Sequence, residues 1–230
     1  MRILKLFTGI TLISIDLLLI LSFPFRYVAG SVERVYYLLA SLGIILYTII
    51  HIVRKPEAFY VWNHEFSHLL ASKLFMRDVK GFHITRKRGG KVVVDRTNFL
   101  IDLSPYIIFP LAIFIVFLAL LMRRAGFPAA TPFYFLTIGY ILGMMFLFTT
   151  EAFFTGQEDI KRNGLLFSAS IIFLCNFIFL PAYLLPGVTG KKIFLDNLAT
   201  LWWKNLSVIL RHIPETATAI YQSAGSFVKR

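Results

Sequence analysis

Residues 131–150 read TPFYFLTIGYILGMMFLFTT, twenty consecutive positions without a charged side chain. A helix of about 20 apolar residues crosses the roughly 30 Å hydrocarbon core of a bilayer. The remaining sequence has the same character, because hydrophobic residues make up 57% of the 230 residues and charged residues only 16%. Soluble domains carry about a quarter charged residues. The sequence therefore predicts an integral membrane protein.

Other apolar runs also have the length of a membrane span, and they cover residues 6–25, 36–53, 99–122 and 165–185. A further run, residues 57–76, is long enough but contains a polar cluster at 64–68. Only helices and closed barrels satisfy all of their backbone hydrogen bonds in lipid. We therefore expect an all-α polytopic membrane protein with five or six transmembrane helices.

The chain has 24 basic and 12 acidic residues, which gives a formal net charge of +12. A basic excess is typical of proteins that bind nucleic acid or anionic membranes. Because long apolar runs separate the charges, we expect the anionic headgroups of the lipid bilayer as partner, and no nucleic acid. The single cysteine, Cys175, excludes an intrachain disulfide and a zinc site built from cysteines.

The most basic loop covers residues 77–98, where seven Lys or Arg residues stand against Asp78 and Asp95. Basic loops are enriched on the cytoplasmic side of a membrane, so we place this loop there, at the plasma or inner membrane of the cell. Within it, residues 81–94 predict a small β-hairpin around Gly89-Gly90, because positions 92–94 are three valines. A disordered basic loop on lipid headgroups is the alternative.

After the last apolar run, residues 191–230 have a different pattern. Leucine and isoleucine recur there at helical spacing, with Lys204 and Arg211 among the polar positions and Trp202-Trp203 in the first half. This pattern predicts an amphipathic helix in the membrane interface, anchored by the two tryptophans. A helix that packs against the transmembrane bundle is the alternative.

The polar cluster at 64–68 is His64-Glu65-Phe66-Ser67-His68, an H-E-x-x-H motif. Residues four apart share one face of a helix, so the two imidazoles can bind one metal ion. Zinc accepts imidazole nitrogens and lowers the pKa of a water molecule toward about 7. Glu65 adjoins the first of these histidines and is the candidate general base. Ionisable groups inside a membrane helix are costly and usually functional, which favours a metal site over a polar contact between helices.

A catalytic zinc site takes three protein ligands, so one more must come from elsewhere in the chain. Two membrane crossings after the basic loop return the chain to the same side shortly before Asp159, which can then meet the histidine pair. We therefore predict Asp159 as the third ligand. The alternatives are other acidic or histidine side chains near the membrane, namely Glu158, Glu151, Asp102 and His83.

The H-E-x-x-H motif, followed by Leu69-Leu70-Ala71, a basic β-prone stretch and a distant aspartate, resembles the site-2 protease type of intramembrane zinc metalloprotease. The run Leu103-Ser104-Pro105-Tyr106 and the run Gln157-Glu158-Asp159-Ile160, with Asn176 beyond them, are similar to compact branches of that family. The resemblance covers residues 63–176. The loop at 123–130 is too short for a PDZ domain, so the chain resembles a compact member without one.

This resemblance implies an intramembrane zinc endopeptidase that cleaves a membrane-protein substrate within or near the bilayer. In that family two histidines and an aspartate bind one Zn²⁺ and a glutamate is the general base. Carried over, His64, His68 and Asp159 bind the metal and Glu65 is catalytic. A β element beside the catalytic helix can pair with the substrate, a role that falls here to residues 81–94.

The resemblance also suggests a division of the chain into three parts. Residues 1–56 would form the N-terminal transmembrane helices, residues 57–185 the metalloprotease membrane core with its β-hairpin, and residues 186–230 the C-terminal amphipathic tail.

Two other classes of function are alternatives to a protease. A regulatory membrane protein can bind a metal without hydrolysis, although an intact Glu65 favours an enzyme. An ion or proton transporter can use intramembrane acids, but such proteins often contain repeated halves, and no repeat is evident.

Overall fold

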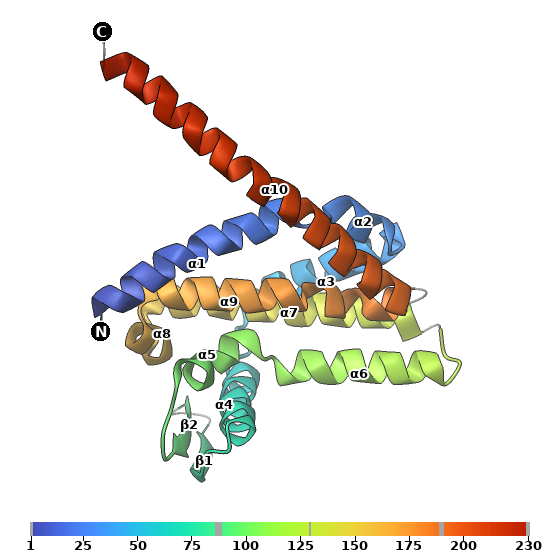
Figure 1. Ribbon diagram of the computed structural model, residues 1–230. Helices are drawn as coiled ribbons and strands as arrows, with labels where there is room; N and C mark the ends of the chain where they lie inside the picture. The colour runs from blue at the N-terminus through green and yellow to red at the C-terminus, as the bar shows by residue number, and fades with distance from the viewer. Residues whose placement is uncertain (1, 86–88, 129, 189–190, 229–230) are drawn as a thin grey trace. The chain divides into compact units, whose positions relative to one another are not determined.

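The computed structural model of the chain describes residues 2–85, 89–128, 130–188 and 191–228 (Figure 1). Most of these residues are helical. The helices are α1 (Arg2–Ser22), α2 (Phe25–Gly30), α3 (Arg34–Val53), α4 (Glu57–Leu74), α5 (Phe99–Ile107), α6 (Pro110–Arg124), α7 (Ala130–Thr155), α8 (Glu158–Asn163), α9 (Leu165–Phe179), the 3₁₀ helix η1 (Leu180–Gly187) and α10 (Lys191–Val228). Two strands, β1 (Val79–Thr85) and β2 (Gly89–Val94), form an antiparallel hairpin. The predicted fold class, an all-α polytopic membrane protein with a small β-hairpin, is confirmed.

Four segments in the described part of the chain are long and apolar enough to cross a membrane as single helices: Leu4–Ser22, Arg34–Val53, Ala130–Thr155 and Leu165–Gly187. The predicted span at 99–122 is two helices instead, because α5 and α6 meet at an angle of 55°. Counted as one broken span, this pair brings the total to five. Helix α4, the conditional sixth span, is not among the candidates and carries Glu57, Glu65 and Lys73.

The break between α5 and α6 falls at Ile108 and Phe109, directly before Pro110, whose ring nitrogen cannot donate a helical hydrogen bond. Neighbouring helices supply polar groups for the backbone that the break leaves free. Ser67 on α4 donates to the carbonyl of Ile108 (2.8 Å), and Asn176 on α9 donates to the carbonyl of Tyr106 (2.7 Å). Irregular backbone at membrane depth persists only where protein satisfies it in this way. The freed carbonyl of Ile108 therefore provides a hydrogen bond between the break and α4.

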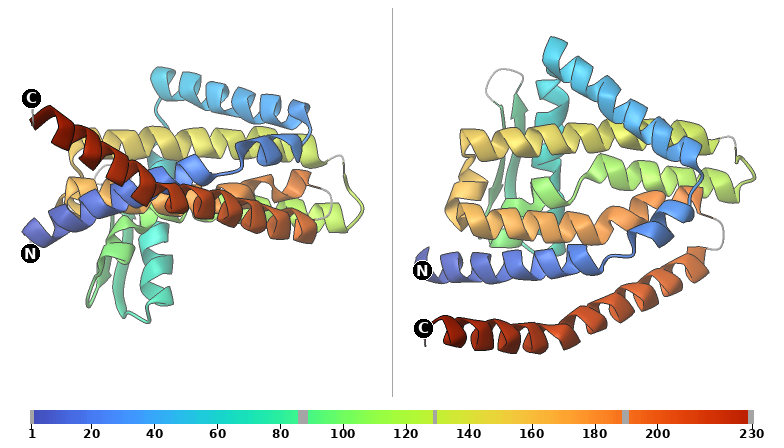
Figure 2. Two further views of the ribbon diagram at one scale, coloured as in Figure 1. Left: turned by 45° about the horizontal axis from the view of Figure 1, so that its top comes forward. Right: turned by 90° about the horizontal axis from the view of Figure 1, so that it is seen from above.

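Helix α3 lies along α7, and the two make an extensive helix pair (Figure 2). Their backbones approach closely where glycines face each other's chain. A β-carbon added to Gly43 would lie 2.1 Å from the carbonyl oxygen of Leu136, and one added to Gly139 would lie 2.0 Å from that of Ala40. Small residues that allow such contact are typical of packed helices in membranes. This pair places the end of α7, and the short α8 that follows it, opposite α4.

The hairpin begins two residues earlier than predicted, at Val79. Val79 pairs with Val94, and Asp95 N–H donates to the carbonyl of Asp78 (3.1 Å) at the base of the hairpin. Gly89 and Gly90 were predicted as the turn, but both lie in β2 and pair with β1. The prediction was wrong because Gly90 serves a tertiary contact described below rather than a turn.

Contacts divide the chain into two units, Met1–Leu12 with Val32–Gly187, and Ile13–Ser31 with Val188–Arg230. In the smaller unit the first half of α10 packs against the end of α1. Trp202 Nε1–H donates to Ser22 Oγ (2.9 Å), and the ring of Phe194 stacks on Tyr27. The helix predicted for the tail is thus confirmed. Its position in the membrane interface and the division at 56 and 185 stay predictions.

Candidate metal centre

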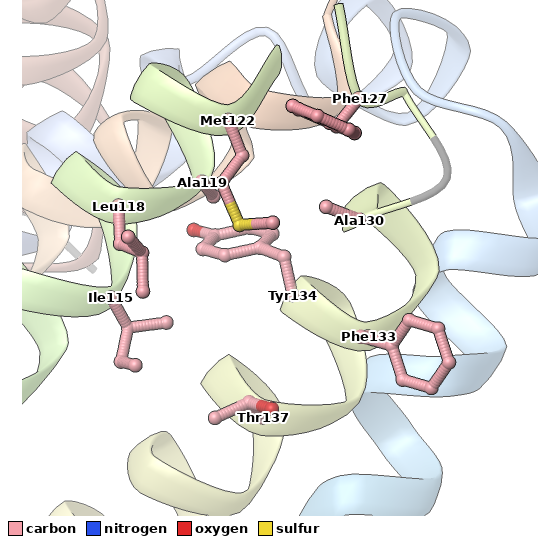
Figure 3. A pocket seen from close by; sticks show the side chains of 9 residues that line it. All are labelled: Ile115, Leu118, Ala119, Met122, Phe127, Ala130, Phe133, Tyr134 and Thr137. Carbon is pink, nitrogen blue, oxygen red and sulfur yellow. The ribbon is translucent and has the colours of Figure 1, made fainter. Parts of the chain in front are cut away.

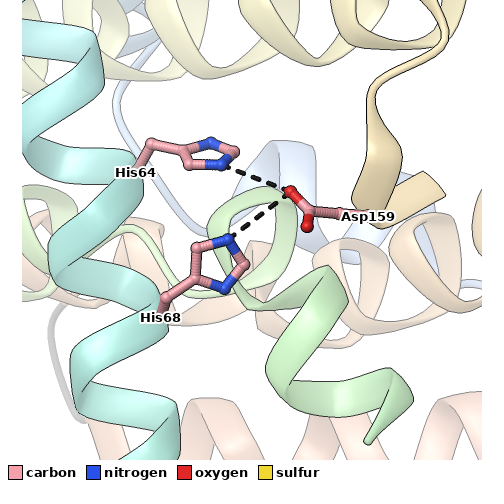
Figure 4. Close-up of side chains that lie close together, drawn as sticks. All are labelled: His64, His68 and Asp159. Atoms are coloured by element: carbon pink, nitrogen blue, oxygen red, sulfur yellow. Dashed lines mark ion pairs between the residues drawn. The ribbon is translucent and has the colours of Figure 1, made fainter. Parts of the chain in front are cut away.

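The larger unit brings together three side chains that can ligate a metal, from two elements far apart in the sequence. His64 and His68 stand one turn apart on α4, and Asp159 lies in the first turn of α8. The Nε2 atoms of the histidines lie 3.4 and 3.5 Å from the same carboxylate oxygen, Oδ2 of Asp159 (Figure 4). The three ligand atoms all lie within 4.8 Å of one another.

These distances can be compared with those in a metal complex. When a tetrahedral ion binds nitrogen and oxygen ligands at about 2.0–2.1 Å, two ligand atoms are about 3.3–3.4 Å apart. The separations between the histidine nitrogens and the Asp159 oxygen are close to this value. Two imidazoles with one carboxylate also match the ligand types of such ions. His64, His68 and Asp159 therefore form a group that could hold a metal ion.

The second nitrogen of each imidazole has a partner that orients the ring. His68 Nδ1 lies 2.9 Å from the carbonyl oxygen of Ile101, to which it donates, so its Nε2 keeps a free lone pair. His64 Nδ1 lies 3.2 Å from the hydroxyl of Tyr60. Metal-binding histidines nearly always have such outer partners, which fix the tautomer and raise ligand basicity. Tyr60, one turn before His64 on the same helix, was not among the predicted site residues, although its spacing was a usable signal.

The charges of the group suit a cation. Burial alone would raise the pKa of Asp159, but the nearby imidazoles of His64 and His68 outweigh it and hold that pKa well below its ordinary value. The carboxylate is therefore ionised at neutral pH. For Glu65, burial raises the pKa of the carboxyl above its ordinary value, although the two histidines oppose this shift. A raised carboxyl pKa suits a group that must accept and then release a proton.

Glu65 contacts strand β2 of the hairpin. Its side chain is 8% exposed, and the backbone N–H of Val92 donates a hydrogen bond to its carboxylate. A β-carbon added to Gly90 would lie 2.1 Å from Cγ of Glu65 and 2.9 Å from Oε1. Because residue 90 is a glycine, the side chain of Glu65 has room to pack against β2. Sequence reasoning missed this contact, since it joins a helix to a strand across the fold.

A cavity of about 600 Å³ opens beside the metal-ligating group. Helix α4, strand β2, the start of α5 and helix α8 all contribute to its wall. Besides the three candidate ligands and Glu65, its lining includes the charged side chains Lys91, Asp95, Arg96, Asp102, Glu158 and Arg162. The candidate site is therefore an open hollow lined by many polar and charged side chains.

The other residues considered as third ligand lie elsewhere or have other partners. Glu158 lines the cavity but is not part of the metal-ligating group. Glu151 contacts His51 (2.9 Å) and Lys55 (2.5 Å) at the end of α3. Asp102 binds residues of α8, and His83 lies in β1 opposite Lys91. The arrangement favours Asp159 among the five candidates.

A second hollow of about 470 Å³ lies between α6 and α7 (Figure 3). The described residues that line it are apolar apart from Tyr134 and Thr137, and they include no imidazole, thiol or carboxylate. The hydroxyl of Tyr134 donates to the carbonyl of Tyr183 (2.6 Å). Among the residues that the structure describes, the lining of this hollow therefore gives no indication of a metal site.

Comparison with protein-family models, with curated proteins and with solved structures gives no match to this chain.

Proposed function

We propose that the chain is an intramembrane zinc endopeptidase of the site-2 protease type, which cleaves a membrane-protein substrate within or near the bilayer. One observation carries this proposal: the Nε2 atoms of His64 and His68 converge on the Asp159 carboxylate beside Glu65, in a polar cavity of a membrane protein. A group that only bound a structural metal would have no need of a buried glutamate next to it or of a hollow large enough for a peptide.

The chemistry follows from the positions of the side chains. Zn²⁺ held by His64, His68 and Asp159 would supply an acidified water molecule and polarise the carbonyl of the scissile bond. Glu65 accepts a proton from the attacking water and then gives it to the leaving amine. Water and peptide are consumed, and a carboxylic acid and an amine are formed. Tyr60 and the Ile101 carbonyl keep the imidazoles oriented throughout.

Strand β2 is suited to hold the substrate. The N–H and C=O of one strand residue point to the same edge of that strand. The N–H of Val92 donates to Glu65 on α4. The edge of β2 that is not paired with β1 therefore faces α4. An extended segment that added to this edge through main-chain hydrogen bonds would have its peptide bonds beside Glu65. We place this edge on the cytoplasmic side, because seven basic residues lie between 77 and 98.

Removal of the metal tests the proposed function directly. The purified protein in detergent is expected to contain about one zinc per chain and to cleave a transmembrane-helix substrate. A chelator should abolish cleavage, and added Zn²⁺ should restore it. Zinc without cleavage of any membrane substrate would favour a regulatory metal-binding protein. No bound metal, and none taken up on titration, would contradict the proposal and favour an ion or proton transporter.

Tyr60→Phe is expected to weaken zinc binding about tenfold, because His64 loses the partner that orients its ring. Competition with a chromophoric chelator measures the affinity. Tyr134→Phe is the matched control, since it also removes a buried hydroxyl with one partner, but away from the metal-ligating group. Equal zinc affinity in Tyr60→Phe and the wild type would contradict a role for this hydroxyl.

A further inference from the structure

The position of the third candidate ligand depends on contacts outside its own helix. Asp159 lies on α8, which has only six residues, Glu158–Asn163. Helices this short are not stable by themselves in water, because the first turn costs more than its few hydrogen bonds return. The contacts that anchor α8 therefore decide whether the Asp159 carboxylate stays opposite the histidine pair.

Asn163, the last residue of α8, is the centre of these contacts. Its side chain is 4% exposed, and its Nδ2 donates both to Oδ2 of Asp102 (2.9 Å) and to the carbonyl oxygen of Asp159 (3.0 Å). Its Oδ1 accepts from Lys5 Nζ (3.4 Å), which also donates to the carbonyl of Arg162 (3.0 Å). Both amide protons of Asn163 thus have a partner, and one partner is the backbone of the candidate ligand.

Asp102 holds the other end of this connection. It is 5% exposed, at the start of α5, and its Oδ1 accepts from Thr97 Oγ1 and from Arg162 (3.3 Å). Both carboxylate oxygens therefore have donors from the protein. A buried carboxylate with this set of partners is an anchor rather than a free ligand, although Asp102 lines the same cavity as the metal-ligating group.

The residue before Asp102 has a parallel role. The carbonyl of Ile101 accepts from His68 Nδ1, while the side chain of Asp102 binds Asn163 on α8. Two consecutive residues of α5 thus contact the helix of one candidate ligand and the ring of another. We propose that Asp102 and Asn163 are positioning residues, which set the distance between Asp159 and the histidine pair and thereby the metal affinity. This inference rests on the proposed zinc site.

Zinc affinity of the full chain in detergent tests it, with chelator competition as the readout. Asn163→Asp keeps the size of the side chain but removes both donated hydrogen bonds and opposes Asp102 with a second carboxylate. We expect zinc binding ten- to a hundredfold weaker, as is common when an outer partner of a metal ligand is lost. Asp95→Asn, which changes another acid that lines the cavity, is the matched control and should bind zinc as the wild type does.

The exchanged pair Asp102→Asn/Asn163→Asp separates positioning from general damage. It restores a donor and an acceptor between α5 and α8, so zinc affinity should rise again toward the wild-type value. The absorption bands of the Co²⁺-loaded proteins give a second readout, since they report coordination geometry. They should change in Asn163→Asp and return in the exchanged pair. If Asn163→Asp does not fold, the exchanged pair alone decides, by folding and binding zinc.

Wild-type zinc affinity in Asn163→Asp would overturn this inference and leave the proposed function intact. An exchanged pair that binds zinc no better than Asn163→Asp, or that does not fold, would do the same. A wild type that binds no zinc would overturn both proposals together. Cleavage is not a readout here, so a wild type that binds zinc without hydrolysis leaves the test of positioning valid.

Discussion

Glu65→Gln is expected to bind zinc as the wild type does and to cleave a membrane-protein substrate about a thousandfold more slowly. Glutamine has nearly the size and shape of glutamate, so it fits between α4 and β2 and leaves His64 and His68 in place. It cannot accept a proton from water at neutral pH. General acid–base catalysis contributes roughly a hundredfold to ten-thousandfold to such reactions, which sets the size of the effect.

Glu158→Gln is the matched control for this experiment. Glu158 is also an acid in the cavity wall and adjoins Asp159, but it is not part of the metal-ligating group. Its replacement should leave both zinc content and the cleavage rate within a few-fold of the wild type. Equal cleavage by Glu65→Gln and the wild type would show that this carboxylate is not the base, and would remove the main support for a protease.

The membrane spans are the part of the fold that the sequence predicts best. Twenty apolar positions in succession have few alternatives to a transmembrane helix, and the runs at 36–53, 131–150 and 165–185 all correspond to helices. The break at Ile108 is different. Pro110 marks it, but proline is also tolerated in the middle of an unbroken transmembrane helix, so the sequence alone does not predict the break. Tertiary contacts stabilise the break, because Ser67 and Asn176, on two other helices, donate hydrogen bonds to the freed carbonyls.

The three residues of the metal-ligating group were also predictable from local sequence pattern, whereas the contacts that support them were not. Spacing on one helix is enough to place His64 and His68 on one face, and the topology expected from the apolar runs returns Asp159 to the same side of the membrane. The supporting contacts have no such signal. Asn163 is not part of any recognisable sequence motif. Its role depends on two simultaneous hydrogen bonds, to the side chain of Asp102 and to the backbone carbonyl of Asp159. The two glycines of β2 even indicated a turn, because local propensity favours one there.

Gly90→Val is expected to lower the cleavage rate about a hundredfold while zinc content stays at one per chain. The β-carbon alone would lie 2.1 Å from Cγ of Glu65, and the valine methyl groups extend further, so Glu65 or β2 must move. A displacement of about 1 Å in a reacting group can cost a hundredfold in rate. His64 and His68 do not contact Gly90 in this way, so the metal-ligating group should persist.

Gly81→Val is the control for this effect, because it places the same side chain in the other strand of the same hairpin. A β-carbon at residue 81 would approach no closer than 3.1 Å to any atom, and that atom is Nε2 at the end of the His83 side chain. Both variants add β propensity, so a general effect on the hairpin would appear in each. A selective loss of cleavage in Gly90→Val would identify the contact between β2 and Glu65 as the cause. Equal rates in the two variants would contradict a specific role for the contact between β2 and Glu65.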